Sequence, residues 1–286
     1  MANLKEVRLR ITSVNSTKQI TNAMRMVSAS KLRKAQNLIL NLRPYAAKLR
    51  ELLEDLSSNI ETPYHETRPM NRVLLIIVTS NKGLCGAFNS NIIKASQKRI
   101  EELYAENSDC KIELITIGKR GTDFFRKTNI PIIACHDDIF EDLTFENTSV
   151  IAEKLMDDFS KGKVDRIEYI YNQFKNASVQ LLQNEVFLPL SMVKAPTSSS
   201  LNANYIFQPN KEDIILELVP KNLKTQLFRV ILSSFTSEHG ARMTTMHKAT
   251  DNANELLKAL KLSYNKARQA SITNEIIEIS GGAEAS

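Results

Sequence analysis

Glycine and proline are almost absent from both ends of the chain, and this feature limits the possible folds more than any other. Residues 3–59 contain one proline, Pro44, and no glycine, whereas residues 221–280 contain one glycine, Gly240, and no proline. Because these two residue types are the main terminators of helices, the sequence predicts a long helix at each end. Two helices that meet at Pro44 are the alternative for the N-terminal end.

Apolar residues recur at steps of three and four along both predicted helices, which is typical of a helix packed along another helix. In the N-terminal helix they are Leu4, Val7, Ile11 and Val14, then Ala35, Leu38, Leu42, Tyr45, Leu49, Leu52 and Leu56. In the C-terminal helix they are Met246, Ala249, Ala253, Leu256, Leu260 and Ala267. We expect the two helices to bury these stripes on each other as a long antiparallel coiled coil. Pro220 is expected to separate a short helix over 211–218 from the long C-terminal helix.

The apolar stripe of the N-terminal helix is interrupted between residues 17 and 36. Continuing the repeat places mostly polar residues on it, because the apolar ones in this stretch fall elsewhere on the helix. The stripe positions are Thr17 or Lys18, Thr21, Met24 or Arg25, Ser28 and Lys31, and the residues elsewhere are Ile20, Met26, Val27, Ala29 and Leu32. We therefore expect this part of the helix to face something other than a single partner helix.

Positive charge is concentrated at the N-terminal end. Residues 1–50 carry eleven Lys and Arg against one acidic residue, Glu6, although the net charge of the whole chain is only +6. Such a basic arm indicates an acidic partner, which could be nucleic acid, anionic lipid or a protein surface. Against nucleic acid, the basic residues are interleaved with Met, Val and Leu, and there is no ladder of aromatic residues. A coiled-coil scaffold or chaperone is the third possibility, but its seam should continue unbroken.

The middle of the chain has a different pattern. Between residues 70 and 200, short β-branched runs such as VLLIIVTS and KIELITIG alternate with amphipathic helical stretches. This alternation predicts a Rossmann-like α/β domain built from βαβ units, whose last two strands form a hairpin at the edge. The predicted organisation is therefore an N-terminal coiled-coil helix over 1–60, a central α/β domain over 70–200 and a C-terminal coiled-coil helix over 211–286.

No motif for catalysis, a cofactor or a metal is found. Gly83 and Gly86 follow the first predicted strand, where phosphate-binding loops occur, but they fit neither GxxxxGK[ST] nor GxGxxG, so we expect a tight structural turn. The three cysteines, Cys85, Cys110 and Cys135, form no CxxC pair and are expected to be buried thiols. The start, MANLKEVR, has no apolar signal region, and no apolar run approaches the length of a membrane span.

Four segments together resemble the gamma subunit family of F-type ATP synthases, and the likeness covers the whole chain. They are TKQITNAMRMVSASKLRKAQ, TSNKGLCGAFNSNI, SEHGARMTTMHKATDNA and YNKARQASITNEIIEISGGAEA. The resemblance implies a non-catalytic rotor shaft that stands inside a ring of three alpha and three beta subunits. By rotating, such a shaft couples ion flow through the membrane sector to ATP synthesis or hydrolysis in the ring.

The resemblance also implies the remaining partners and the location. The α/β domain would lie against the epsilon subunit and the ring of c subunits. The protein would then be peripheral, on the cytoplasmic face of the bacterial inner membrane, and would bind no nucleic acid. The residues implied to contact beta subunits are Met24, Arg25, Lys31, Arg242, Arg268 and Gln269.

Overall fold

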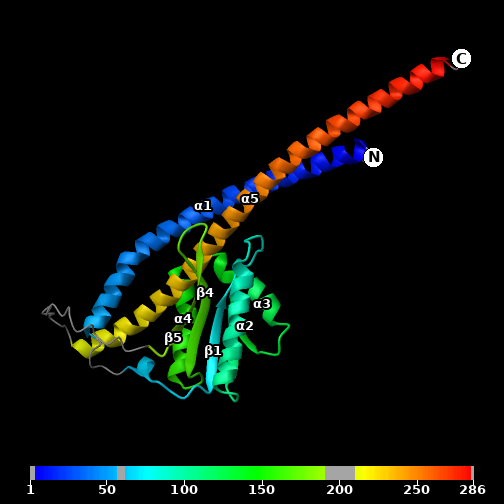
Figure 1. Cartoon of the computed structure of the whole chain (residues 1–286). Coiled ribbons are helices and arrows are strands. Elements are labelled where there is room, and N and C mark those ends of the chain that lie inside the picture. The colour runs from blue at the N-terminus through cyan, green and yellow to red at the C-terminus, as the bar shows by residue number, and fades with distance from the viewer. Residues whose placement is uncertain (1–3, 57–61, 191–209, 285–286) are drawn as a thin grey trace. The chain divides into compact units, whose positions relative to one another are not determined.

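The computed structural model describes residues 4–56, 62–190 and 210–284. Two long helices enclose a central run of alternating strands and helices in sequence, as predicted (Figure 1). In chain order the elements are α1 (Leu4–Leu56), the short 3-10 helix η2 (Pro63–His65), β1 (Arg72–Val78), α2 (Phe88–Glu106), β2 (Lys111–Ile117), α3 (Lys119–Phe125), β3 (Ile132–Cys135), the 3-10 helix η3 (Asp138–Phe140), α4 (Phe145–Ser160), β4 (Arg166–Phe174), β5 (Gln180–Leu188) and α5 (Lys211–Glu284).

Both long helices continue through their prolines. Pro44 lies inside α1 and Pro220 lies inside α5. The predicted break at Pro220 is therefore wrong, as is the alternative of two helices meeting at Pro44. A proline removes one backbone hydrogen bond, but packing on both sides compensates for that loss. Val219 and Leu223, which flank Pro220, are 3% and 0% exposed.

The chain divides into two compact units, which are described separately. Unit 1 comprises Met1–Ala29 and Arg242–Ser286, and unit 2 comprises Ser30–Ala241. Each long helix contributes residues to both units.

Unit 2 is built on a five-stranded sheet with the order β3-β2-β1-β4-β5. β1 is parallel to both β2 and β4, whereas β5 is antiparallel to β4, which confirms the predicted edge hairpin. The residues of β1 from Val73 to Val78 are at most 1% exposed. This continuous burial is typical of a parallel strand that is covered on both faces.

Helices cover both faces of the sheet. Val73, Leu75 and Ile77 of β1 share an apolar cluster with α2 and α3, because alternate side chains of a strand point to the same face. The other β1 side chains share a cluster with α4 and with the first part of α5, which supplies Ile215, Val219, Leu223, Leu227, Val230 and Ile231. The helix predicted as a coiled-coil element thus begins as a layer of the α/β unit (Figure 1).

The second part of α1 packs on this same stretch of α5 within unit 2. Ala35 is 2% exposed and shares a small cluster with Phe228 and Leu232 of α5. Ile39 and Leu42 are partly buried against that cluster. The small side chain of Ala35 lets the larger side chains of α5 approach the backbone of α1.

A buried ion network joins α2 to β4. The carboxylate of Glu168 is 1% exposed and accepts two hydrogen bonds from Arg99, both at 2.9 Å, and one from Arg166 at 2.6 Å. Burial by itself would raise the pKa of Glu168, but Arg99, Arg166 and a hydrogen bond from Asn184 together hold that pKa below its usual value. The network therefore contains a buried, ionised carboxylate between β4 and α2.

All three cysteines were predicted to be buried, but only two of them are. Cys85 and Cys110 are buried, and burial raises the pKa of the Cys110 thiol. Cys135 is exposed, so the prediction is wrong for this residue. The reason is its place on β3, a short strand at the edge of the sheet, where alternate side chains face away from the core.

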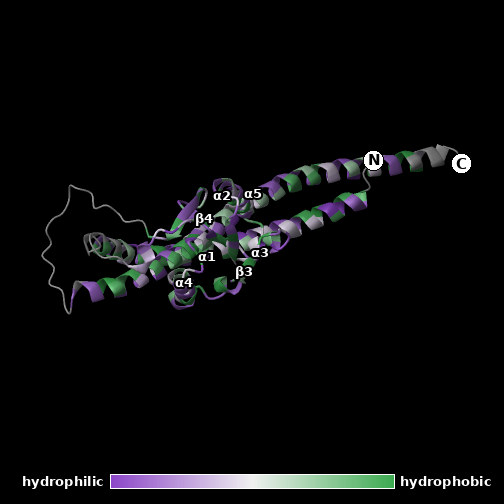
Figure 2. Cartoon of the chain, turned by 90° about the horizontal axis from the view of Figure 1, so that it is seen from below, coloured by the Kyte–Doolittle hydropathy of each residue, from purple (hydrophilic) through white to green (hydrophobic). Residues whose placement is uncertain are grey.

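None of the described helices is both long enough and apolar enough to cross a membrane. Figure 2 shows that hydrophilic and hydrophobic residues alternate along both long helices.

Candidate functional site

Unit 1 consists of two antiparallel helical segments, which confirms the predicted pairing. Residues 4–29 of α1 lie beside the part of α5 that begins at Arg242, and both chain ends point the same way (Figure 1). The hydroxyl groups of Thr21 and Thr250 form a hydrogen bond of 2.9 Å between the two helices. This bond fixes which residues of the two helices lie opposite each other.

The contact between these segments is one continuous seam, so the interruption predicted for residues 17–36 is absent over 17–29, the part that belongs to unit 1. Thr21 and Ser28 are 9% and 3% exposed, so the polar stretch belongs to the helix pair. Small hydroxyl side chains fit between closely packed helices, and Thr21 also donates to the Lys18 carbonyl oxygen at 3.0 Å. The buried and half-buried seam residues are Leu4, Val7, Ile11, Val14, Lys18, Thr21, Arg25 and Ser28 of α1, and Met246, Thr250, Ala253, Leu257, Leu260, Tyr264 and Ala267 of α5.

Several large apolar residues predicted for the stripes lie elsewhere. Leu256 is 49% exposed, whereas its neighbour Leu257 is 7% exposed and occupies the seam. In unit 2, Leu38 and Tyr45 are 48% and 52% exposed, and Leu32, which was placed off the stripe, is 6% exposed. The prediction followed the bulkiest side chains, whereas the packing follows a helical phase that small residues also occupy.

We predict that the Thr21–Thr250 hydrogen bond stabilises unit 1 cooperatively. Thr21→Val and Thr250→Val together should show a coupling energy of about 0.5–1.5 kcal/mol, because neither hydroxyl reaches its partner once either is removed. Urea unfolding followed by far-ultraviolet circular dichroism measures this energy in a double-mutant cycle. Thr12 is the matched control, because its exposed hydroxyl bonds only the Arg8 carbonyl oxygen. Additive effects of the two threonine substitutions would contradict the prediction.

The outer surface of the α1 segment in unit 1 exposes large apolar side chains. Ile20, Met26 and Val27 are 60%, 56% and 59% exposed. Exposed apolar residues close together in sequence and on one helix mark a surface that contacts another molecule more often than isolated ones do. This surface is therefore the candidate functional site of unit 1.

Three of the predicted contact residues lie near one another in unit 1. Met24 and Arg25 are half-buried, and Arg25 donates a hydrogen bond of 2.9 Å to the side chain of Asn22. Arg242 is 6% exposed. With Thr21 opposite Thr250 in an antiparallel pair, Arg25 lies opposite Met246, one helical turn from Arg242. Met24, Arg25, Arg242 and Met246 thus lie at nearly the same level along the helix pair.

The other predicted contact residues are not brought to this level. Arg268 and Gln269 are exposed and lie near the start of α1, about 33–40 Å along the helix axis from Met246 and Arg242. Lys31 is exposed and belongs to unit 2. The six predicted contact residues therefore belong to three separate parts of the structure and do not form one site.

One exposed feature was not predicted as a site. Leu4, the first described residue of α1, lies opposite Ala267, so α5 continues beyond its partner. Past that point Ile272, Ile276 and Ile279 are 48%, 60% and 73% exposed. Their spacing of four and three places them on one face of the helix, and this spacing was the available sequence signal.

The strand ends of unit 2 are occupied by α5. In open α/β sheets, ligands bind beyond the carboxyl ends of strands where the order reverses, here between β1 and β4. The Phe174 backbone N–H at the end of β4 donates to the Ser233 hydroxyl at 2.9 Å. A Cβ on Gly240 would meet the Ala177 backbone at 3.2 Å, and Ala241 joins the apolar cluster of β1 and α2. The usual ligand crevice is thus filled by a helix of the same chain.

The loop after β1 contains the two predicted turn glycines. Gly86 has a φ of +62°, and Leu84 beside it has the same positive value. A Cβ on Gly83 would meet the Arg120 side chain at 3.1 Å. This loop, residues 79–87, connects β1 to α2. Among the described residues, no group of three or more His, Cys, Asp and Glu side chains is placed to hold a metal ion.

Comparison with known proteins identifies relatives over the full length of the chain. A family model described as ATP synthase matches residues 3–285. An ATP synthase gamma chain of Flavobacterium johnsoniae is 56% identical, over 100% of this chain and 99% of the relative. An ATP synthase gamma chain of Chloroherpeton thalassium is 48% identical, over 100% of this chain and 98% of the relative.

Solved structures share the fold. The central stalk and c-ring structure of the Tetrahymena thermophila mitochondrial ATP synthase contains a chain with 26% identity and a TM-score of 0.59, covering 80% of this chain and 99% of that one. A chain in the Euglena gracilis mitochondrial ATP synthase has a TM-score of 0.72 at 19% identity and covers 99% of this chain and 94% of that one. With its paired terminal helices and its central sheet, the chain belongs to the gamma chain family of ATP synthases.

Proposed function

We propose that this gamma chain, the central rotor shaft of an F-type ATP synthase, transmits rotation through contacts of its outer surface with surrounding alpha and beta subunits. The observation that carries the proposal is the seam of unit 1. It buries one face of each helix and leaves Ile20, Met26 and Val27 exposed on the outside. A rod held together internally keeps its outer surface available for a partner that surrounds it.

We assign Met24 and Arg25 to one level of beta-subunit contact, and Arg268 and Gln269 to another nearer the end of the shaft. Arg242 lies at the first level, but it is only 6% exposed, so most of its side chain is covered by this chain itself. Lys31 of unit 2 adds a separate exposed cation. Exposed ion pairs contribute only about 0–1 kcal/mol each. Contacts of this size are made and broken in succession as the shaft turns, whereas one strongly complementary contact would hold it in a single orientation.

The isoleucines beyond the start of α1 fit an apolar collar at the top of the alpha and beta ring. Ile272, Ile276 and Ile279 lie on one face of α5, beyond the part that lies opposite described residues of α1. An apolar collar would cover this surface without fixing a direction, because the hydrophobic effect is non-directional.

We further propose that the chain is not catalytic. The strand-end crevice, where an α/β fold would bind a nucleotide, is filled by Ser233, Gly240 and Ala241 of α5. ATP chemistry then belongs to the surrounding subunits. The shaft changes their states by differential contact.

The remaining partners are proposed by analogy with the related structures, which contain the central stalk, F1 and the c-ring. The α/β unit would contact the epsilon subunit and the c-ring. The protein would be peripheral on the cytoplasmic face of the bacterial inner membrane, and it would bind no nucleic acid. Purification from membranes together with alpha, beta, epsilon and c subunits would support this assignment.

The contact at Met24 is tested with Met24→Lys. We expect the complex to assemble but ATP-driven proton pumping per ATP hydrolysed to fall, because an ammonium group at this half-buried position cannot make the apolar contact proposed for Met24 and is costly to bury. Inverted membrane vesicles measure pumping and hydrolysis in parallel. Met24→Leu is the control, since it keeps an apolar side chain without charge. Normal pumping by Met24→Lys would contradict the contact.

A further inference from the structure

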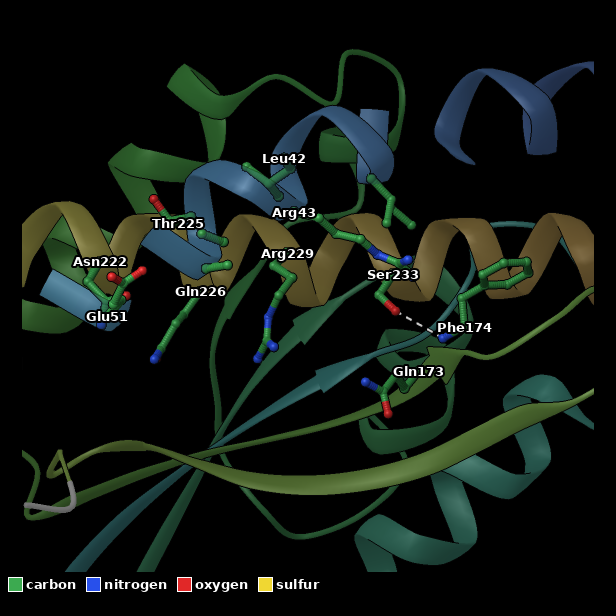
Figure 3. Close-up of a pocket in the computed structure, with 13 residues that line it drawn as sticks. Leu42, Arg43, Glu51, Gln173, Phe174, Asn222, Thr225, Gln226, Arg229 and Ser233 are labelled. Atoms are coloured by element: carbon green, nitrogen blue, oxygen red, sulfur yellow. Dashed lines mark hydrogen bonds between the residues drawn. The ribbon is translucent and has the colours of Figure 1, made fainter. Parts of the chain in front are cut away.

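A cavity of about 390 Å³ lies within unit 2, between α1, α5 and the end of β4 (Figure 3). Its volume falls in the range of small-molecule sites. One side is formed by successive turns of α1, and the opposite side by successive turns of α5. Gln173 and Phe174 of β4 close a third side.

The two helical sides of the cavity differ in polarity. The α1 side contributes the apolar residues Ile39, Leu42, Ala46 and Ala47, together with the charged residues Arg43 and Glu51. The α5 side contributes polar groups, and among them the amides of Asn222 and Gln226 have no hydrogen bond to any described residue. The polar residues from α5 are Asn222, Thr225, Gln226, Arg229 and Ser233. A ligand with an apolar body and a polar head matches a lining that combines apolar turns of α1 with charged and polar side chains.

The charge of the lining is positive. The guanidinium of Arg229 forms an ion pair with the Glu185 carboxylate at 3.5 Å. The Glu51 carboxylate forms an ion pair with the Lys48 ammonium group at 2.7 Å. Arg43 also lines the cavity and forms no ion pair or hydrogen bond within the described ranges. Arg43 is an exposed residue, and its guanidinium is therefore available to pair with a carboxylate or a phosphate.

We propose that this cavity binds a small amphipathic anion, namely a carboxylate or phosphate monoester on a short apolar chain. The head group pairs with Arg43 and accepts hydrogen bonds from polar side chains of the α5 side. The apolar chain lies along Ile39, Leu42 and Ala47. Because the lining comes from both α1 and α5, the bound anion stabilises the packing of these helices in unit 2. The proposal does not depend on the contacts assigned to unit 1.

The full-length chain is titrated with hexanoate and with hexyl phosphate, by calorimetry and by the rise in Tm. Hexanol and hexyltrimethylammonium are the matched neutral and cationic probes. We expect both anions to bind more tightly than either comparator, and the tighter of the two identifies the head group. Arg43→Gln should weaken binding of the anions about tenfold, which corresponds to about 1.4 kcal/mol. Ala47→Leu should also weaken it by filling the apolar side.

Arg33→Gln is the control, since it removes an exposed cation of α1 that is not part of the lining. It should leave the Kd unchanged. Equal binding of hexanol and hexanoate would overturn the proposal, as would an unchanged Kd in Arg43→Gln. The titration is repeated with the assembled complex. Loss of binding there would show that another subunit fills the cavity, and would equally overturn it.

Discussion

Replacing Gly118 with alanine should destabilise unit 2 by about 3–5 kcal/mol, because two separate penalties combine. Gly118 follows β2 with a φ of +100°, a conformation that side chains rarely adopt. A Cβ there would overlap the carbonyl oxygen of Thr79, which is backbone and cannot rotate away. The Thr79 hydroxyl donates to the Gly118 carbonyl oxygen at 2.9 Å and accepts from the Gly121 N–H at 2.8 Å. Separating these backbones would therefore break bonds that join the ends of β1 and β2.

The urea midpoint of unfolding measures the effect, with soluble yield as a second readout. Gly162→Ala is the matched control, because Gly162 also has a positive φ, of +69°. A Cβ on Gly162 would meet only the Arg68 side chain, at an ordinary 3.6 Å. This control should cost about 1–2 kcal/mol. Equal losses for the two variants would show that the close approach to Thr79 adds nothing.

Glu168→Ala should cost about 3–5 kcal/mol, because it leaves buried positive charge without its partner. Arg99 donates to both oxygens of Glu168, and its side chain is only 14% exposed. Its remaining carboxylates, Glu102 and Glu106, lie 3.3 Å away and are much more exposed. Arg166 also loses its bond to Glu168. The loss should appear as a lower urea midpoint with an unchanged slope.

Glu102→Ala is the matched control for the same arginine. Its pair with Arg99 is largely exposed, so the expected loss is below about 1 kcal/mol. Similar losses for Glu102→Ala and Glu168→Ala would contradict the view that burial makes the network important.

The Glu168 effect should also depend on pH. The folded protein holds the pKa of Glu168 below its ordinary value of 4.5. The carboxylate therefore contributes to the free energy of unfolding above about pH 4.5 and loses that contribution as the pH falls through the lower folded-state pKa. The stability difference between wild type and Glu168→Ala should accordingly shrink in acid. A difference that stays constant between neutral pH and pH 3 would contradict this explanation.

The sequence predicted the order of elements correctly because each signal was local. The β-branched run of β1 and the absence of glycine from α1 are read directly from neighbouring residues. The break at Pro220 failed for the opposite reason. One lost hydrogen bond is a local penalty, whereas the burial of Val219 and Leu223 against the sheet is a tertiary gain. Propensity alone could not compare the two.

The residues of the candidate site could be predicted from the sequence, but their positions along the helix pair could not. Resemblance indicated Met24, Arg242 and Arg268, and the fold places the first two near one level and the third far along the shaft. The phase of the seam could not be read from side-chain size, since Leu256 and Leu257 are equally apolar. Ile272, Ile276 and Ile279 could be identified as a separate apolar face only from the structure, because it places Leu4, the first described residue of α1, opposite Ala267.

The amino-acid sequence by itself determined that the chain has a long helix at each end, a βαβ domain between them and an excess of positive charge near its start. These follow from periodicity, helix terminators and composition, which need no knowledge of distant contacts. Only the tertiary structure decided that α5 covers the sheet before it joins the helix pair, and that Thr21 and Ser28 lie inside the seam. Both depend on how closely two segments far apart in sequence approach, and that distance is set by the packing of both partners together.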